Sequence, residues 1–470
     1  MVTIMSLNKE AKNTHSKLDI VSYGFGSLSR EFIKMAFNTY IFFYYETEVG
    51  LNVWYISIAL VLFAVYNAIN DPLLGYLTNR SFKFTKKWGR RFPFIFLGGI
   101  PLGISYFLVF TPPNVNPQSG GLILFFYLIL VTFLFDTFHS LFFVSYQALF
   151  PDKYRSLDER RTVTGIQIPM ALVGTALGAI IPPLFIEYND LGTYVVQGFV
   201  ALIITTVILL LAIPGCREDP KTIAHYVKSY EEEKKKKSSF IDSLKRAFTQ
   251  TSFVSFVVLY TMYQACTGMM TASISYVVQF TLGMEADATT LLMAGFLLGA
   301  IIASPIWMYF AKRSNDNRKV MLTATFAMVI FTIPLIFLES YIPLIIAIAI
   351  WGTSLGGWWL MLFPVMGDII DESVTLNEKR EEGTYTGIQQ FFGRLGFVIQ
   401  VLSFAIVHTL TGFQEASNIQ TDFALFGIKI HLAIIPMICM LIGGLIFWKW
   451  YDLTPEKVMA NQARLKEMNL

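Results

Sequence analysis

The sequence predicts an all-α integral membrane protein of twelve transmembrane helices, arranged as two bundles of six. Of its 470 residues, 54% are hydrophobic and only 15% are charged. A soluble protein would carry about 25% charged residues. Apolar runs long enough to cross a bilayer, roughly 20 residues each, recur along the chain. A long polar segment near the middle divides them into two sets of six.

Each predicted span is an apolar run bounded by polar residues. The first six lie near 19–45, 51–77, 92–111, 122–150, 163–187 and 194–214. The second six lie near 251–281, 287–311, 318–338, 341–366, 384–412 and 427–451. The resulting parts are an N-terminal tail (1–18), a first bundle (19–214), a linker (215–250), a second bundle (251–451) and a C-terminal tail (452–470).

Lysine and arginine gather in alternate loops. The basic loops are 78–91, 152–161, 215–250, 312–319 and 378–382, whereas 46–50, 112–121, 188–193, 282–287 and 413–426 contain no Lys or Arg. Because basic loops remain in the cytoplasm, we expect a multi-pass protein of the cell membrane with both termini cytoplasmic. The run Glu231–Lys237 (EEEKKKK) is expected to be a solvated linker, with a regulatory or lipid-binding patch as the alternative.

Several classes of function are excluded by what the sequence lacks. A net charge of +3 spread over loops does not indicate nucleic-acid binding. The three cysteines, Cys216, Cys266 and Cys439, form no CxxC or Cys/His pattern, so we expect no metal site and no cofactor. The polar start predicts no cleaved signal peptide, and no enzymatic motif stands out. The expected partners are the bilayer and a small molecule, with the protein itself a monomer.

Short sequence motifs recur at corresponding positions in the two sets of spans. Pro72 precedes Arg80 by eight residues at the end of the second span, and Pro305 precedes Arg313 by eight at the end of the eighth. The sequence Thr-Gly-Ile-Gln opens the fifth span at 164–167 and the eleventh at 386–389. Parallel repeats of this kind predict the major facilitator architecture, with a substrate site between the two halves.

Charged residues lie inside the predicted spans, where each costs about 2.5–3.5 kcal/mol on insertion scales. Such residues usually face a polar cavity, so they indicate a route for a polar solute or ion. They are Arg30, Glu31, Lys34, Asp71, Asp136 and Arg394.

Three longer motifs narrow the prediction. The first joins Tyr-Gly-Phe-Gly at 23–26 to Arg-Glu-Phe at 30–32, and the second runs from 68–76 to 88–93. The third comprises Asp368, Asp371, Arg380, Gly383, Tyr385, Phe391, Phe392 and Arg394. Together they resemble the glycoside–pentoside–hexuronide:cation symporter family over residues 19 to about 450.

The resemblance implies a coupling-ion site on the second and fourth spans. Asp71 matches one family carboxylate, while Asn67 and Phe143 stand where the family has two others. Asn67 and Asp71 share one helix face at a spacing of four. Asp136 lies one heptad before Phe143, about 10 Å along the helix. Either Asp136 replaces the missing carboxylate in a shifted site, or the site is lost.

The resemblance also implies a sugar site. Arg30 and Glu31 match a basic–acidic pair on the first span, and Arg394 matches a functional Lys on the eleventh. Gln167 falls where the family has a sugar-binding Arg, and Trp359 matches a Trp that could pack on a sugar face. Lys34 is an added cation, and His139 stands within one turn of Asp136.

Structural alternatives remain open for these residues. Glu31 and Lys34 could simply pair along their helix, Trp359 could be interior packing, and His139 a hydrogen-bonded packing residue. Asp71 could belong to a cytoplasmic gate. The remaining candidates for gate or helix-end charges are Arg80, Arg90, Asp368, Asp371 and Arg380.

The predicted function is secondary transport of a glycoside, oligosaccharide or related sugar by alternating access, coupled to H⁺ or Na⁺. One alternative substrate is a lysophospholipid-like amphiphile, whose zwitterionic headgroup could contact opposite charges. Uncoupled facilitated diffusion and a non-transporting membrane receptor are further alternatives.

Overall fold

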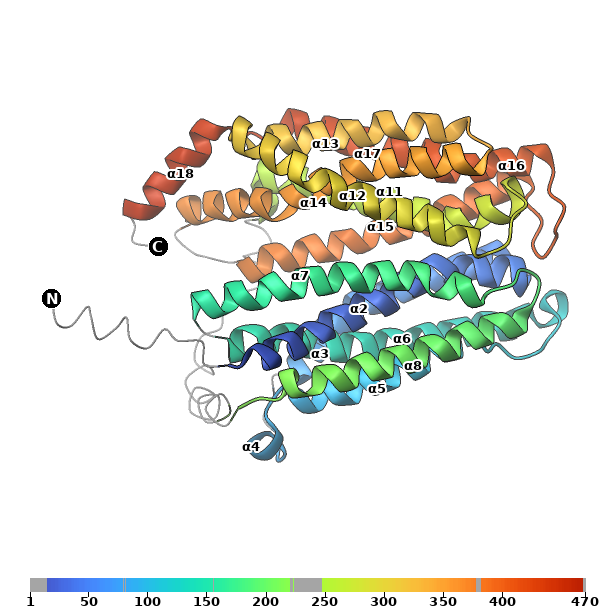
Figure 1. Ribbon diagram of the computed structural model, residues 1–470, viewed down its shortest axis with the longest axis horizontal. Helices are drawn as coiled ribbons and strands as arrows, with labels where there is room; N and C mark the ends of the chain where they lie inside the picture. The colour runs from blue at the N-terminus through green and yellow to red at the C-terminus, as the bar shows by residue number, and fades with distance from the viewer. Residues whose placement is uncertain are drawn as a thin grey trace. The chain divides into compact units, whose positions relative to one another are not determined.

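The computed structural model describes residues 15–78, 80, 82–154, 156–219, 223, 247–377 and 382–467. All regular secondary structure in these ranges is helical (Figure 1). The charged run Glu231–Lys237, most of the predicted linker and Arg380 lie outside the described residues. The all-α prediction is therefore confirmed for the part of the chain that the structure describes.

The described chain divides into two compact units. The first comprises the described parts of 1–51 and 58–237, and the second comprises 52–57 and the described parts of 238–470. The exact limits predicted for the two bundles stay predictions. Each unit is described by itself below.

The first unit contains long helices joined by short connections. Its elements are α2 (Lys17–Phe43) with the π-helix η1 (Tyr44–Glu48), α3 (Val53–Thr78) from residue 58 onward, α4 (Thr85–Trp88), α5 (Phe92–Val109), α6 (Pro117–Lys153), α7 (Leu157–Ile180), the 3-10 helix η2 (Pro182–Phe185) and α8 (Leu191–Cys216). Among these, α2 packs extensively on α7 and α8, and α5 packs on α6 and α8.

The second unit also consists mainly of long helices. Its elements are α11 (Thr251–Tyr276) with η3 (Val277–Thr281), α12 (Ala288–Ser314), α13 (Asn317–Thr332) with η4 (Ile333–Ile336), α14 (Tyr341–Asn377), α15 (Glu382–Thr411), α16 (Asp422–Lys429), η5 (Ile430–Ile434), α17 (Ile435–Trp450) and α18 (Pro455–Glu467). Here α12 and α13 pack on α14, while α15 and α17 pack on α11.

Eleven helical segments in the described residues are long and apolar enough to cross a membrane. They correspond to the second to twelfth predicted spans. The remaining prediction falls on α2, which is long enough at 27 residues but carries Arg30, Glu31 and Lys34 near its middle. These charges lower its apolar character, so the count of twelve stays a prediction.

The two units share two local structural features beyond the short sequence repeats described above. The first long helix of each unit, α2 or α11, passes directly into a five-residue π-helix, η1 or η3. Near the end of the second helix of each unit, an arginine donates to a tyrosine hydroxyl one turn earlier. These pairs are Arg80 with Tyr76 at 2.9 Å and Arg313 with Tyr309 at 3.4 Å.

Two glycines bring α7 against the backbone of α2. A Cβ atom on Gly174 would lie 2.3 Å from the carbonyl oxygen of Leu28, and one on Gly178 would lie 2.3 Å from that of Phe32. Small residues four apart permit this close helix approach. The crossing fixes the part of α2 that carries Arg30 and Glu31.

Candidate functional site

Arg30 and Glu31, neighbours on α2, form an ion pair. Their Nη1 and Oε1 atoms are 2.9 Å apart, and the side chains are 24% and 21% exposed. Lys34 lies one turn further along the helix and interacts electrostatically with Glu31, as does His139 of α6. Because lipid is a costly environment for charge, the exposed parts of this pair require water or a ligand.

The structure adds an ion-pair partner for Glu31 that spacing alone did not indicate. Arg30 has no acidic residue three or four positions away, and a pair of Glu31 with Lys34 was one structural alternative. The ion pair joins the adjacent residues Arg30 and Glu31, while Lys34 also interacts electrostatically with Glu31. The long side chains of Arg30 and Glu31 allow their contact although the two Cα–Cβ bonds point in different directions around the helix.

Phe143 of α6 forms the other contact of Arg30. The guanidinium carbon lies 3.6 Å from the centre of the phenyl ring, in a cation–π arrangement. Arginine is suited to such stacking because its guanidinium is planar and weakly hydrated. Thus, at the position where the resembled family has a carboxylate, this protein has an aromatic ring beneath its own fixed cation.

A neutral hydrogen-bonding group lies one turn before the ion pair on α2. Gln167 of α7 donates from Nε2 to Tyr146 Oη of α6 at 3.0 Å and to Ser27 Oγ of α2 at 3.3 Å. The hydroxyls of Ser27 and Tyr146 are 3.0 Å apart. Ser27 and Glu31 share a helix face at a spacing of four. Polar groups of three helices therefore converge beside Arg30 and Glu31.

Asp136 of α6 is held by two amides of α3. Asn67 and Asn70 each donate through Nδ2 to a different carboxylate oxygen, the Asn70 bond measuring 2.9 Å. The carboxylate is nearly inaccessible, because Asp136 is only 2% exposed. A neighbouring bond joins Tyr66 Oη of α3 to Thr137 Oγ1 of α6 at 2.8 Å. The predicted ion-site residues Asn67 and Asp136 are thus in direct contact, and Asp71 follows Asn70 on the same helix.

Sequence reasoning missed Asn70, Ser27 and Tyr146. Asn70 could have been predicted, because Asn67 and Asn70 are three residues apart and can therefore approach one acceptor on a facing helix. Ser27 also had a signal, since it precedes Glu31 by one helical turn. Tyr146 had none, because its role depends on how α6 packs against α2 and α7.

The predicted gate residues of the first unit contact other groups. Arg80, two residues beyond the end of α3, lies over Tyr76 of that helix, with Cζ 4.7 Å from the ring centre. Arg90 forms an ion pair with Asp152 at 2.7 Å, and Arg91 reaches the same carboxylate at 3.4 Å. The segment before α5 that contains Arg90 and Arg91 is therefore joined to the end of α6 by these ion pairs. A gating role for these residues stays a prediction.

The second unit positions its predicted residues on α14 and α15. Trp359 donates from Nε1 to Tyr263 Oη of α11 at 2.5 Å, and the neighbouring Trp358 stacks on Tyr263 with ring centres 3.5 Å apart. Asp368 accepts from Asn317 Nδ2 at 2.8 Å. Asp371 lies on α14 and Arg394 on α15. The functional roles of these residues stay predictions.

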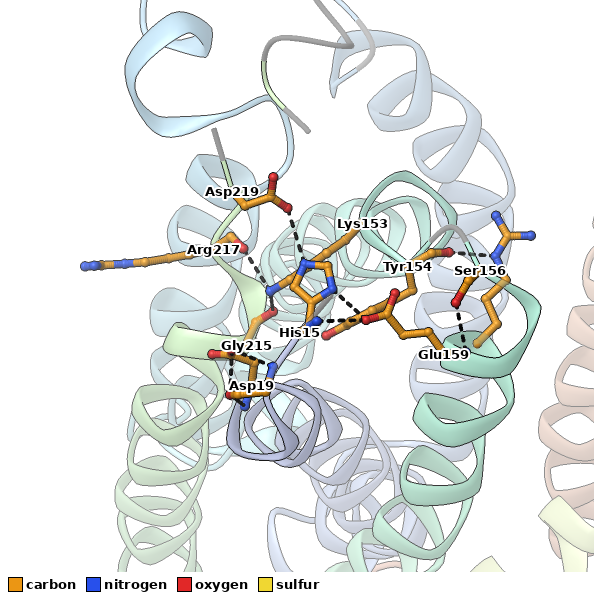
Figure 2. Close-up of polar contacts among 11 residues, drawn as sticks. His15, Asp19, Lys153, Tyr154, Ser156, Glu159, Gly215, Arg217 and Asp219 are labelled. Carbon is orange, nitrogen blue, oxygen red and sulfur yellow. Dashed lines mark hydrogen bonds and ion pairs between the residues drawn. The ribbon is translucent and has the colours of Figure 1, made fainter. Parts of the chain in front are cut away.

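A further polar cluster anchors the start of α2 (Figure 2). His15 lies between two carboxylates, with Nδ1 2.8 Å from Glu159 Oε1 of α7 and Nε2 3.3 Å from Asp219 Oδ2. Lys153 donates to the carbonyl oxygens of Gly215 and Arg217 at 2.5 and 3.0 Å. These contacts hold the ends of α2, α6, α7 and α8 together, which is a structural task.

Comparison with known proteins decides the family. The family model described as MFS/sugar transport protein matches residues 22–455. The chain belongs to this family. The protein is therefore a multi-pass membrane transporter and not an enzyme, and the resemblance found in its motifs is confirmed at the level of the symporter family.

Individual relatives are similar over most of their lengths. The transporter is 23% identical to the sodium-dependent lysophosphatidylcholine symporter 1 of Gallus gallus, over 98% of this chain and 91% of that protein. It is 23% identical to the protein of the same name from Homo sapiens, over 88% and 79%. It is 20% identical to the inner membrane symporter YicJ of Escherichia coli (strain K12), over 95% and 94%.

Proposed function

We propose that this transporter carries a glycoside or related sugar across the cell membrane, and that Arg30 and Glu31 contact the solute directly. Transport proceeds by alternating access in a monomer whose termini are both cytoplasmic. The observation that carries the proposal is the partly exposed Arg30–Glu31 ion pair beside the Gln167–Ser27–Tyr146 group.

The chemistry of these side chains suits a ligand with many hydroxyls. A sugar hydroxyl can donate to the Glu31 carboxylate while accepting from the Arg30 guanidinium or the Gln167 amide. Hydrogen bonds to charged groups are worth about 1.5–3 kcal/mol each, roughly twice the neutral value. A small set of such groups can therefore give both affinity and orientation, and stacking on Phe143 keeps the Arg30 fork in a defined position.

Coupling is proposed at Asp136. Its two oxygens accept from Asn67 and Asn70, so the carboxyl group joins α3 to α6. A proton on Asp136 would remove one acceptor site, and a Na⁺ ion beside it would compete with the amide donors. Either ion therefore changes how α3 is held. By linkage, an ion that raises solute affinity is itself bound more tightly when solute is present.

A lysophospholipid is the second candidate substrate. The named activity of the Gallus gallus and Homo sapiens relatives supports it, and so does the pairing of opposite charges at Arg30 and Glu31. A guanidinium can bind a phosphate through two parallel hydrogen bonds, and a carboxylate can contact a quaternary ammonium group. Lys34 adds a second base for the phosphate.

Uptake into proteoliposomes separates the candidates. Purified protein is tested with labelled α- and β-glycosides, a hexuronide and lysophosphatidylcholine, under imposed Na⁺ gradients, H⁺ gradients and neither. We expect saturable uptake of a glycoside that an ion gradient accelerates. Uptake of lysophosphatidylcholine alone would replace the sugar proposal with the second candidate, and equal uptake without any gradient would remove the coupling proposal.

A further inference from the structure

A groove of about 610 Å³ runs along the outer face of α13 in the second unit. Its apolar wall includes Leu322, Phe326 and Ile330, spaced four residues apart on one helix face. Ile330 is 58% exposed, so no described residue covers this end. Because α13 is one of the candidate membrane spans, the natural occupant of such a face is a lipid chain.

One end of this groove is basic and polar. Arg318 and Lys319 line it in the first turn of α13, together with Trp448 from the end of α17. Arg318 donates from Nη2 to the Trp448 carbonyl at 2.6 Å, which holds its guanidinium at the groove. The buried Arg318 Nε has no hydrogen-bond acceptor among the described residues. Trp448 is 59% exposed, and tryptophan is characteristic of the headgroup level of a membrane.

The acidic residue that lines this end of the groove already has a hydrogen-bond partner. Asp316 is the N-cap of α13, and its side chain accepts from the Lys319 backbone N–H at 2.9 Å. Among the residues that line the groove, two bases and one capping acid therefore lie at this end, and the N-terminus of the 16-residue helix adds partial positive charge. The basic end therefore favours an anionic headgroup.

The dimensions fit one acyl chain in one leaflet. From Lys319 to Ile330 the helix advances about 16 Å at 1.5 Å per residue, which is close to half of a hydrocarbon core about 30 Å thick. We propose that the α13 groove is a binding site for an anionic glycerophospholipid, with its phosphate at Arg318 and Lys319 and one acyl chain along Leu322, Phe326 and Ile330. This site is independent of the proposed transport substrate.

Native mass spectrometry of the full-length protein tests the proposal. Delipidated protein is titrated with phosphatidylglycerol or phosphatidylcholine of identical acyl chains, and bound lipid is counted. We expect a preference for phosphatidylglycerol that falls about fivefold in Lys319→Gln, the effect of removing one base near a membrane surface. Lys319 is chosen because its side chain is exposed, and thermal unfolding verifies that the variant is folded.

Two further variants sharpen the test. Lys312→Gln removes a base at the end of α12 that does not line the groove, and should leave the preference unchanged. Ala327→Trp fills the apolar part and should weaken both lipids alike. The proposal is overturned if the unaltered protein shows no preference for phosphatidylglycerol, or if Lys319→Gln and Lys312→Gln reduce that preference equally.

Discussion

Arg30 has two contacts of different physical kinds, an ion pair with Glu31 and a stacking contact with Phe143. The ion pair neutralises charge within the site, whereas the ring limits the orientations of the guanidinium. A solute in the site could also contact Glu31 and Phe143, the two residues that contact Arg30. The arrangement therefore allows a ligand to take over hydrogen bonds of the pair without leaving either charge unpartnered.

Phe143→Leu tests the contribution of stacking. The substitution keeps an apolar side chain but removes the ring face, and a cation–π contact is worth about 0.5–2 kcal/mol. We expect solute affinity to fall about 2- to 30-fold, while the melting temperature changes little. Phe133→Leu is a matched control, because Phe133 of α6 stacks on Tyr66 of α3, whereas the ring beneath Arg30 is that of Phe143. Equal losses of affinity in the two variants would contradict a specific role for Phe143.

The sequence indicated the charged residues of the candidate site on α2 and α6, but it missed the hydroxyl groups of Ser27 and Tyr146 and left the ion-pair partner of Glu31 open. Buried charge in an apolar run is visible in the sequence because its cost is large and local. The choice of Arg30 rather than Lys34 as the ion-pair partner of Glu31 depends on rotamers and on the ring of Phe143. Tyr146 was missed for the same reason, since its contacts come from helix packing.

At the scale of elements, α3 is joined to α6 by the hydrogen bonds that converge on Asp136. Asp136→Asn would place a donor where two donors already point. A buried donor left without an acceptor costs about 1–3 kcal/mol. We expect the variant to lose this much stability and most ion-stimulated uptake, as measured by thermal unfolding and proteoliposome flux.

A donor–acceptor exchange distinguishes a specific network from general intolerance of the site. In Asp136→Asn with Asn70→Asp, residue 136 can accept from Asn67 and donate to residue 70. This double variant should recover a substantial part of the lost stability. Asp287→Asn, at an exposed position before α12, should have no effect. Failure of the exchange to recover stability would show that the bonds to Asn70 are not what holds Asp136.

Glu48, the last residue of η1, forms a contact that we expect to depend on pH. Burial raises the pKa of Glu48 to about 7, although hydrogen bonds from Tyr194 Oη and the Asn189 backbone oppose the shift. Glu48 lies beyond the predicted first span (19–45). Because its pKa is higher in the folded state, stability should be greatest below the ordinary carboxyl range and fall as the pH rises through about 7.

Glu48→Gln isolates this effect. Glutamine keeps an oxygen that can accept a hydrogen bond but cannot ionise, so the melting temperature of the variant should fall less than that of the unaltered protein between pH 5 and pH 8. Differential scanning fluorimetry across this range measures both. Parallel curves for the two proteins would mean that Glu48 does not contribute to the pH dependence.

At the scale of the whole molecule, apolar runs and the low proportion of charged residues predicted the helical membrane class, and the helices lie close to the predicted spans. The first span is the exception to simple hydropathy, because the charges that indicate the site also lower the apolar character of α2. In α2, therefore, the charged residues that the candidate site contains also make the helix harder to identify as a membrane span from hydropathy. The repeat of a π-helix after α2 and α11 was not predictable, since it depends on backbone hydrogen bonding rather than on a shared motif.

The accessibility of the two termini decides the span count. If α2 crosses the bilayer, twelve spans place both ends on the same side, whereas eleven place them on opposite sides. Epitope tags at the N- and C-termini are probed with impermeant antibodies before and after permeabilisation. We expect neither tag to be accessible in intact cells and both to be accessible after permeabilisation. One tag exposed in intact cells would contradict the topology.

The central claim is that Glu31 and Arg30 bind the transported solute, and equilibrium binding to purified protein tests it most directly. The affinity for the transported solute is measured in the unaltered protein, in Glu31→Gln and in the surface control Glu339→Gln. In the unaltered protein Glu339 pairs with Lys429. Loss of a charged hydrogen bond predicts binding about 10- to 100-fold weaker in Glu31→Gln, with a cooperative melting transition that shows the variant to be folded and with normal binding in the control. Equal affinity in all three proteins would contradict the account.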